Sequence, residues 1–145
     1  MENKKFKPLI DKLFWFIWIP LAVVLIAATA LSALDTVALI IILGTDIFTL
    51  YFLISSLVGY VEIRENSVFI KCGFILKKEI PYGKIRGLSK ERKFYSESMI
   101  SIKNAFEHVN IKYNKFDVIS VSVSSNDELI RELEARMASA NNTKI

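Results

Sequence analysis

Residues 13–58 read LFWFIWIPLAVVLIAATALSALDTVALIIILGTDIFTLYFLISSLV and decide the architecture of the chain. Only two charged residues, Asp35 and Asp46, interrupt this stretch, whereas most of the charge of the 145-residue chain lies after residue 60. A helix of about 20 apolar residues crosses the ~30 Å hydrocarbon core of a bilayer. The stretch therefore predicts a transmembrane helical hairpin with spans at residues 13–34 and 37–58.

The charges that flank the hairpin indicate its orientation. Residues 1–12, MENKKFKPLIDK, form a basic leader with four lysines, whereas the break at Asp35-Thr36 has no cation. Arg64 and Lys71 follow the second span. Lys and Arg accumulate on the cytoplasmic side of membrane proteins. We therefore expect a multi-pass protein of the plasma membrane with both termini in the cytoplasm.

Asp46 is the one residue of the hairpin that anchoring does not explain. It lies about ten residues into the second span, or ~15 Å deep at helical rise. A carboxylate near the bilayer centre costs about 2.5–3.5 kcal/mol, so it is expected to be protonated or paired. Residues 23–25 of an antiparallel partner span lie level with it and offer no partner. Two interpretations stay open: a polar contact with another membrane protein or a second copy, or a bond to its own helix, Thr45 or Thr49.

From residue 60 onward the pattern of apolar residues changes to an alternation of period two, which is typical of half-buried strands. Asn66-Ser67 has the chemistry of a turn, and residues 89–98, SKERKFYSES, are typical of a polar loop. The predicted strands are Tyr60–Glu65, Val68–Cys72, Phe74–Ile80, Lys84–Leu88, Met99–Ile102, His108–Tyr113 and Phe116–Val123.

A helix is predicted after these strands. Ser125 to Glu128 matches the capping box S-x-x-E, and the helix carries an apolar stripe of Leu129, Ile130, Leu133 and Met137. Residues 141–145 are expected to be frayed. The expected fold class is a membrane α-hairpin plus an α+β domain at 60–140, in which an antiparallel partial barrel is closed by the C-terminal helix.

Two segments carry a resemblance to a known family: GYVEIRENSVFIKCGFILKKEIPYGKIRGL (59–88) and HVNIKYNKFDVISVSVSSNDELIREL (108–133). With two spans before them, they resemble the short bacterial proteins that have a YyaB-like PH (pleckstrin-homology-like) domain. The resemblance implies a PH-like fold on a membrane anchor, and it implies no established activity. Eukaryotic PH domains that bind inositol phosphates use a basic loop between their first strands. The corresponding turn here, Asn66-Ser67, has no cation, which argues against that ligand.

The residues that carry catalysis in other proteins do not form a recognisable pattern here. The chain has no phosphate-binding glycine loop and no nucleophile or zinc-protease motif. One His and one Cys are too few for a usual zinc site. We therefore expect no enzyme activity, no cofactor and no metal, and the modest net charge of +4 does not indicate a nucleic-acid binder.

A basic run after the third predicted strand is the candidate binding site of the tail. It contains Lys84, Arg86, Lys90, Arg92 and Lys93. Near a membrane, each such cation contributes about 1 kcal/mol of attraction to anionic lipid. The alternative interpretation is an ordinary solvated loop.

Two functions follow from these expectations. The first is a membrane-anchored PH-like binding or scaffold protein that docks a protein partner, a second copy or the lipid surface at the cytoplasmic face. The second is an immunity or stress-protection protein, whose spans would intercept membrane-active peptides.

Overall fold

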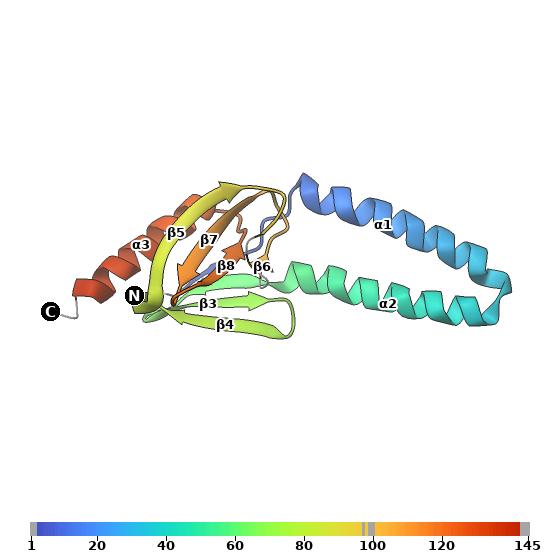
Figure 1. Cartoon of the computed structure of the whole chain (residues 1–145), viewed down its shortest axis with the longest axis horizontal. Helices are drawn as coiled ribbons and strands as arrows, with labels where there is room; N and C mark the ends of the chain where they lie inside the picture. Colours follow the sequence, from blue (N-terminus) through green and yellow to red (C-terminus); the bar gives the residue numbers. More distant parts are fainter. Residues whose placement is uncertain (1–2, 97, 99–100, 143–145) are drawn as a thin grey trace.

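The computed structural model describes residues 3–96, 98 and 101–142. A long helical hairpin projects from one end of a small domain that consists of two sheets and a helix (Figure 1). The two helices leave the domain side by side and meet at their far ends. We call the end of the domain where these two candidate membrane spans join it the membrane-facing end, and the opposite end the far end.

The hairpin consists of α1 (Lys12–Leu31), a 3₁₀ turn η1 (Ser32–Leu34) and α2 (Thr36–Val58). Aspartates cap both helices: Asp11 accepts from the Leu13 amide, and Asp35 accepts from the amides of Val37 and Ala38. Both helices are long and apolar enough to cross a membrane, and their apolar side chains are largely exposed.

The first strand of the domain, β1 (Lys4–Phe6), lies before α1, in the segment that the sequence analysis treated as a leader. It pairs antiparallel with β2 (Tyr60–Ile63), so that Phe6 lies opposite Val61. Phe6 is buried. The leader is therefore part of the folded domain, and the helical hairpin is inserted between the first two strands.

The remaining strands of the first sheet follow the hairpin. Its order is β1-β2-β3-β4, with β3 (Ser67–Cys72) and β4 (Leu76–Pro81) joined by a tight turn. The predicted strands at 60–65 and 68–72 are thus confirmed with small shifts of their ends. Phe74 and Ile75 belong to the turn and not to a strand, because Gly73 at φ +69° reverses the chain one residue earlier.

The second sheet has the order β5-β7-β8-β6 among the described residues. After the short turn η2 (Tyr82–Lys84) come four strands: β5 (Ile85–Arg92), β6 (Ser101–Ile102), β7 (Glu107–Tyr113) and β8 (Asp117–Val121). Residues 89–92, expected in a loop, continue β5, because their backbone pairs with β7 up to Arg92 opposite Glu107. Of the predicted strand at 99–102, residues 99 and 100 lie outside the described part of the chain.

The helix α3 (Asn126–Asn142) lies against the sheets (Figure 1). Leu129 and Leu133 are fully buried in the core, and Ile130 and Met137 pack against it, so the predicted apolar stripe is confirmed. The helix extends to Asn142, and residues 141 and 142, expected to fray, are helical. Glu128, the fourth residue of the predicted capping box, contacts the Lys4 ammonium of β1 through its carboxylate.

Candidate functional site

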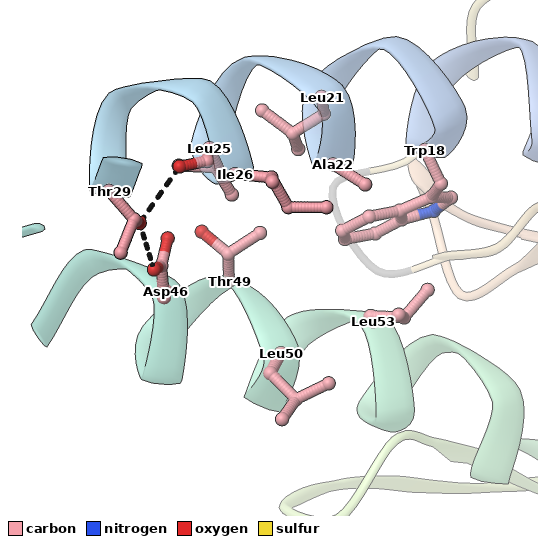
Figure 2. Close-up of a pocket in the computed structure, with 10 residues that line it drawn as sticks. All are labelled: Trp18, Leu21, Ala22, Leu25, Ile26, Thr29, Asp46, Thr49, Leu50 and Leu53. Carbon is pink, nitrogen blue, oxygen red and sulfur yellow. Dashed lines mark hydrogen bonds between the residues drawn. The ribbon is translucent and has the colours of Figure 1, made fainter. Parts of the chain in front are cut away.

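A crevice of about 410 Å³ lies between α1 and α2 (Figure 2). Seven of the ten residues that line it are apolar, among them Trp18 on α1 and Leu53 on α2. The three polar residues are Thr29, Asp46 and Thr49. The crevice is thus an apolar surface between the two candidate membrane spans, with a small polar group near one end.

Asp46 is paired with the other helix of the hairpin. The Thr29 hydroxyl lies 2.8 Å from Asp46 Oδ2 and 2.9 Å from the Leu25 carbonyl, and it is placed to donate to both. A hydroxyl carries one hydrogen, so the two acceptors share it. The other carboxylate oxygen, Oδ1, is buried and has no hydrogen-bond partner among the described residues. One acceptor therefore stays unused in the crevice.

The sequence analysis missed Thr29, the residue of α1 that pairs with Asp46. It placed residues 23–25 level with Asp46, where no partner is available, and left open a contact with another chain or a bond within α2, whereas the structure pairs Asp46 with Thr29. In a helix each Cα–Cβ bond leans toward the N-terminus. Because the two helices are antiparallel, the side chains of Thr29 and Asp46 lean toward each other, and residues at different levels can meet.

A double-mutant cycle of Thr29→Val and Asp46→Leu tests this pair. We expect a coupling energy of about 0.6 kcal/mol, and at most about 1.7 kcal/mol, which is the range of hydrogen bonds between membrane helices. Asp46→Asn should keep most of this coupling energy. The asparagine amide can donate to the Thr29 hydroxyl oxygen, while the hydroxyl hydrogen bonds the Leu25 carbonyl. The measurement is the unfolding equilibrium of the full chain in mixed micelles.

Thr45→Val is the matched control for this cycle, because the Thr45 hydroxyl bonds the Ile41 carbonyl of its own helix, 3.0 Å away. Thr45→Val should show no coupling to Asp46→Leu. A coupling of zero between positions 29 and 46 would contradict the pairing.

The structure does not gather the basic run into one patch. Lys84 and Arg86 lie near the far end of the domain, whereas Arg92 and Lys93 lie at or just beyond the other end of β5, toward the helical hairpin. The Arg86 guanidinium donates to the backbone carbonyls of Asn114 and Lys115. Whether this run binds lipid stays a prediction, and its cations do not act from one surface.

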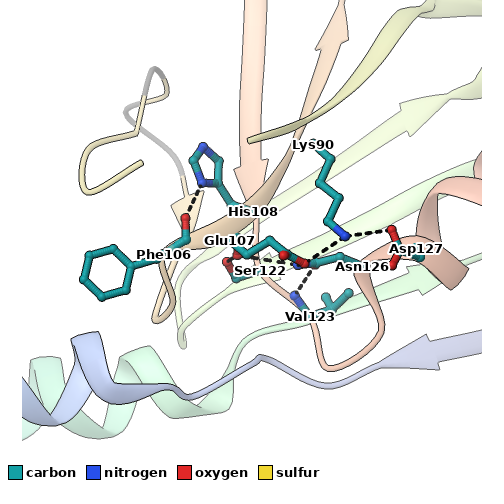
Figure 3. A network of polar contacts seen from close by, with 8 residues as sticks. All are labelled: Lys90, Phe106, Glu107, His108, Ser122, Val123, Asn126 and Asp127. Carbon is teal, nitrogen blue, oxygen red and sulfur yellow. Dashed lines mark hydrogen bonds and ion pairs between the residues drawn. The ribbon is translucent and has the colours of Figure 1, made fainter. Parts of the chain in front are cut away.

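Lys90 belongs to a polar network between β5, β7 and the start of α3 (Figure 3). Its ammonium lies 3.1 Å from Glu107 and 2.8 Å from Asp127. The hydrogen bond to Asp127 raises the pKa of Lys90, and the same bond lowers the pKa of Asp127. Likewise, the bond from Lys93 lowers the pKa of Glu91. These two lysines are therefore largely neutralised by the protein itself.

The same network fixes the start of α3 (Figure 3). The Asn126 side chain accepts from the Val123 amide at 2.9 Å and donates to the Glu107 carboxylate at 3.3 Å. His108 is fully buried, and its Nδ1 lies 3.1 Å from the Phe106 carbonyl. This arrangement indicates a structural role for the network.

The far end of the domain carries a surface that the sequence analysis missed. Phe116, in the turn between β7 and β8, is 85% exposed. A shallow hollow of about 210 Å³ beside it is lined by Arg86, Lys112 and Lys115 among others. The Lys115 ammonium lies 5.3 Å from the centre of the Phe116 ring. The sequence signal was an apolar residue directly after the turn residues Asn114 and Lys115.

These features define a class of protein: a domain of two sheets and a C-terminal helix, built around a long apolar helical hairpin. The strand pairs are antiparallel except for β6 and β8, which pair parallel and so depart from the antiparallel barrel that the sequence predicts. The family model of the bacterial PH domain matches residues 59–137, which is more than half of the chain. The chain therefore belongs to the bacterial PH domain family, as the resemblance indicated. Searches of curated proteins and of solved structures found no match.

Proposed function

We propose that this protein is a membrane-anchored binding module that docks a protein partner at the cytoplasmic face of the plasma membrane. One observation carries the proposal: the far end of the domain presents an exposed phenylalanine among three cations. Aromatic residues and arginine are enriched at the centres of protein interfaces. The chemistry fits a partner segment that combines an apolar side chain with carboxylates.

The distance of this surface from the membrane favours a protein over lipid. The β7 strand runs from Glu107, at the membrane-facing end, to Tyr113, just before the Phe116 turn. Six residues of strand span about 20 Å. Lipid headgroups do not reach across that distance, whereas a cytoplasmic protein does.

The attachment to the membrane supports a module held in one orientation. Phe6 and Val61, which flank the hairpin in sequence, pair in one sheet. The Asp11 carboxylate accepts from the Phe106 amide at 3.2 Å, and the Asn104 side chain donates to the Ser56 carbonyl at 2.8 Å. The helices are thus joined to the domain without a flexible linker, and the Phe116 surface points away from the bilayer.

A photo-cross-linking amino acid in place of Phe116, in the full chain in living cells, tests the proposal. We expect a discrete adduct with one protein, and Lys112→Glu with Lys115→Glu should reduce its yield at least several-fold, because the cations attract the partner. Asn66 is the matched control position, since it is exposed in the β2–β3 turn at the same end. Equal adducts at positions 66 and 116, or none, would contradict the docking surface.

The orientation of the hairpin can be measured in the same cells by cysteine labelling. In a Cys72→Ala background, a membrane-impermeant maleimide should label Thr36→Cys in intact cells and Phe116→Cys only after permeabilisation. Burial raises the pKa of the native Cys72 thiol to about 11, which makes this thiol slow to react. The reverse labelling pattern would place the domain outside the cell.

The crevice favours a second candidate function, protection against membrane-active peptides. An apolar groove with one unused acceptor at Asp46 Oδ1 fits an amphipathic peptide inside the membrane. Cells that carry Asp46→Leu should then lose protection, whereas Asp46→Asn should retain it. Equal peptide sensitivity of both variants and the parent chain would remove this candidate.

A further inference from the structure

The turn between β3 and β4 exposes a cluster of apolar side chains. Phe74, Ile75 and Leu76 are 43%, 75% and 51% exposed. We call these three residues the β3–β4 tip. Three consecutive exposed apolar residues at the tip of a hairpin mark an interaction site.

The β3–β4 tip lies against α2, at the membrane-facing end of the domain (Figure 1). The rings of Phe74 and Tyr51 are 5.7 Å apart. Gly73 comes so close to the helix that a Cβ there would lie 2.0 Å from the Ser55 hydroxyl oxygen. The tip therefore reaches back along α2, past the point where the helix enters the domain.

This contact places the tip at the depth of the membrane interface. Tyr51 lies seven residues before Val58, where α2 ends, which is about 10 Å at helical rise. The 23 residues of α2 span about 35 Å, only ~5 Å more than the hydrocarbon core. Tyr51, and Phe74 beside it, thus lie within the leaflet. On α1, Trp15 and Trp18 lie three and six residues after Lys12, at a similar depth, as expected of an aromatic belt.

Lysines follow the apolar tip at the level expected for headgroups. Lys71 and Lys77 lie opposite each other in the β3–β4 ladder, one residue pair behind Cys72 and Leu76. An apolar tip with cations directly behind it matches the boundary between acyl chains and anionic headgroups.

We infer that the β3–β4 tip inserts into the cytoplasmic leaflet, so that the domain contacts lipid directly in addition to its two helices. The occupant of this surface is lipid because the tip contacts α2 at a depth where lipid surrounds the helix. The insertion fixes the tilt of the domain and thereby the direction of the Phe116 surface. The inference rests on the proposed placement of α1 and α2 in the bilayer.

Spin labels on the full chain test the insertion in vesicles of phosphatidylethanolamine and phosphatidylglycerol. In a Cys72→Ala background, Ile75→Cys carries the label, and collision rates with oxygen and with a water-soluble nickel complex are compared. Oxygen concentrates in lipid and the nickel complex in water. At position 75 we expect a higher collision rate with oxygen than with the nickel complex. Phe116→Cys, at the far end of the domain, is the matched control in water. Leu76→Cys is a second position in the tip.

A label at Ile47→Cys, an exposed position on α2, distinguishes insertion of the helices from insertion of the β3–β4 tip. If position 47 reports lipid and position 75 reports water, the helices are inserted and the tip is not, which overturns the inference alone. If position 47 also reports water, the membrane anchoring itself is wrong. A lipid signal at 47 and 75, with water at 116, supports both.

Discussion

Phe6→Ala is expected to lower the free energy of unfolding of the domain by about 3–5 kcal/mol, the usual cost of truncating a buried phenylalanine. Phe6 is 4% exposed and belongs to the core cluster, although it lies in a strand of three residues before the first helix. The measurement is equilibrium unfolding of the full chain in micelles, with near-ultraviolet circular dichroism of the domain. Hydrogen exchange of the β2 amides provides a local readout.

Lys5→Ala is the matched control, because Lys5 occupies the same strand and its side chain is 62% exposed. Its contact with Glu62 is 3.8 Å long, and a surface pair of this kind contributes about 0–1 kcal/mol. Equal effects of Phe6→Ala and Lys5→Ala would contradict a structural role for β1. A fragment that begins at residue 59 lacks β1 altogether and should be less stable than Phe6→Ala.

Leu133→Ala is expected to destabilise the domain by about 2–5 kcal/mol, because the side chain is fully buried and its removal leaves a cavity. The effect should appear as a lower midpoint of urea unfolding with an unchanged slope. Loss of α3 packing would also weaken the network at Asn126, where the helix begins.

Glu134→Ala, one residue further along α3, is the control for this prediction. Glu134 is exposed, and an exposed substitution usually changes stability by no more than about 0.5 kcal/mol. If both variants unfolded at the same urea concentration, α3 would not be part of the domain core.

Most strands after the hairpin were predictable because apolar and polar residues alternate along them. In β7, for example, Val109, Ile111 and Tyr113 alternate with residues of mostly polar character, and the alternation marks the strand within a residue of its observed start. The continuation of β5 through Ser89–Arg92 was not predictable. Its residues are polar, and only the pairing with β7 makes them a strand.

The candidate sites were harder to predict from the sequence than the strands, because their contacts join segments that are far apart in the chain. Asp46 was singled out because a carboxylate in an apolar span is costly, but its partner Thr29 required the facing helix. The cluster of cations between residues 84 and 93 was evident in the sequence. However, most of these residues belong to one strand of eight residues, so the first and last cations lie at opposite ends of the domain. The exposure of the β3–β4 tip could not be predicted, because apolar residues such as Phe74 and Ile75 are equally typical of a buried strand.

The sequence by itself determined the two apolar helices, most strands of the PH-like domain and the apolar stripe of α3, because each depends on local periodicity and burial. Only the tertiary structure decided that β1 precedes the hairpin and completes the first sheet, and that the β3–β4 tip lies against α2. Both are contacts between segments far apart in the chain. Such contacts arise from the pairing of backbone edges and the filling of a shared core, which local sequence patterns do not encode.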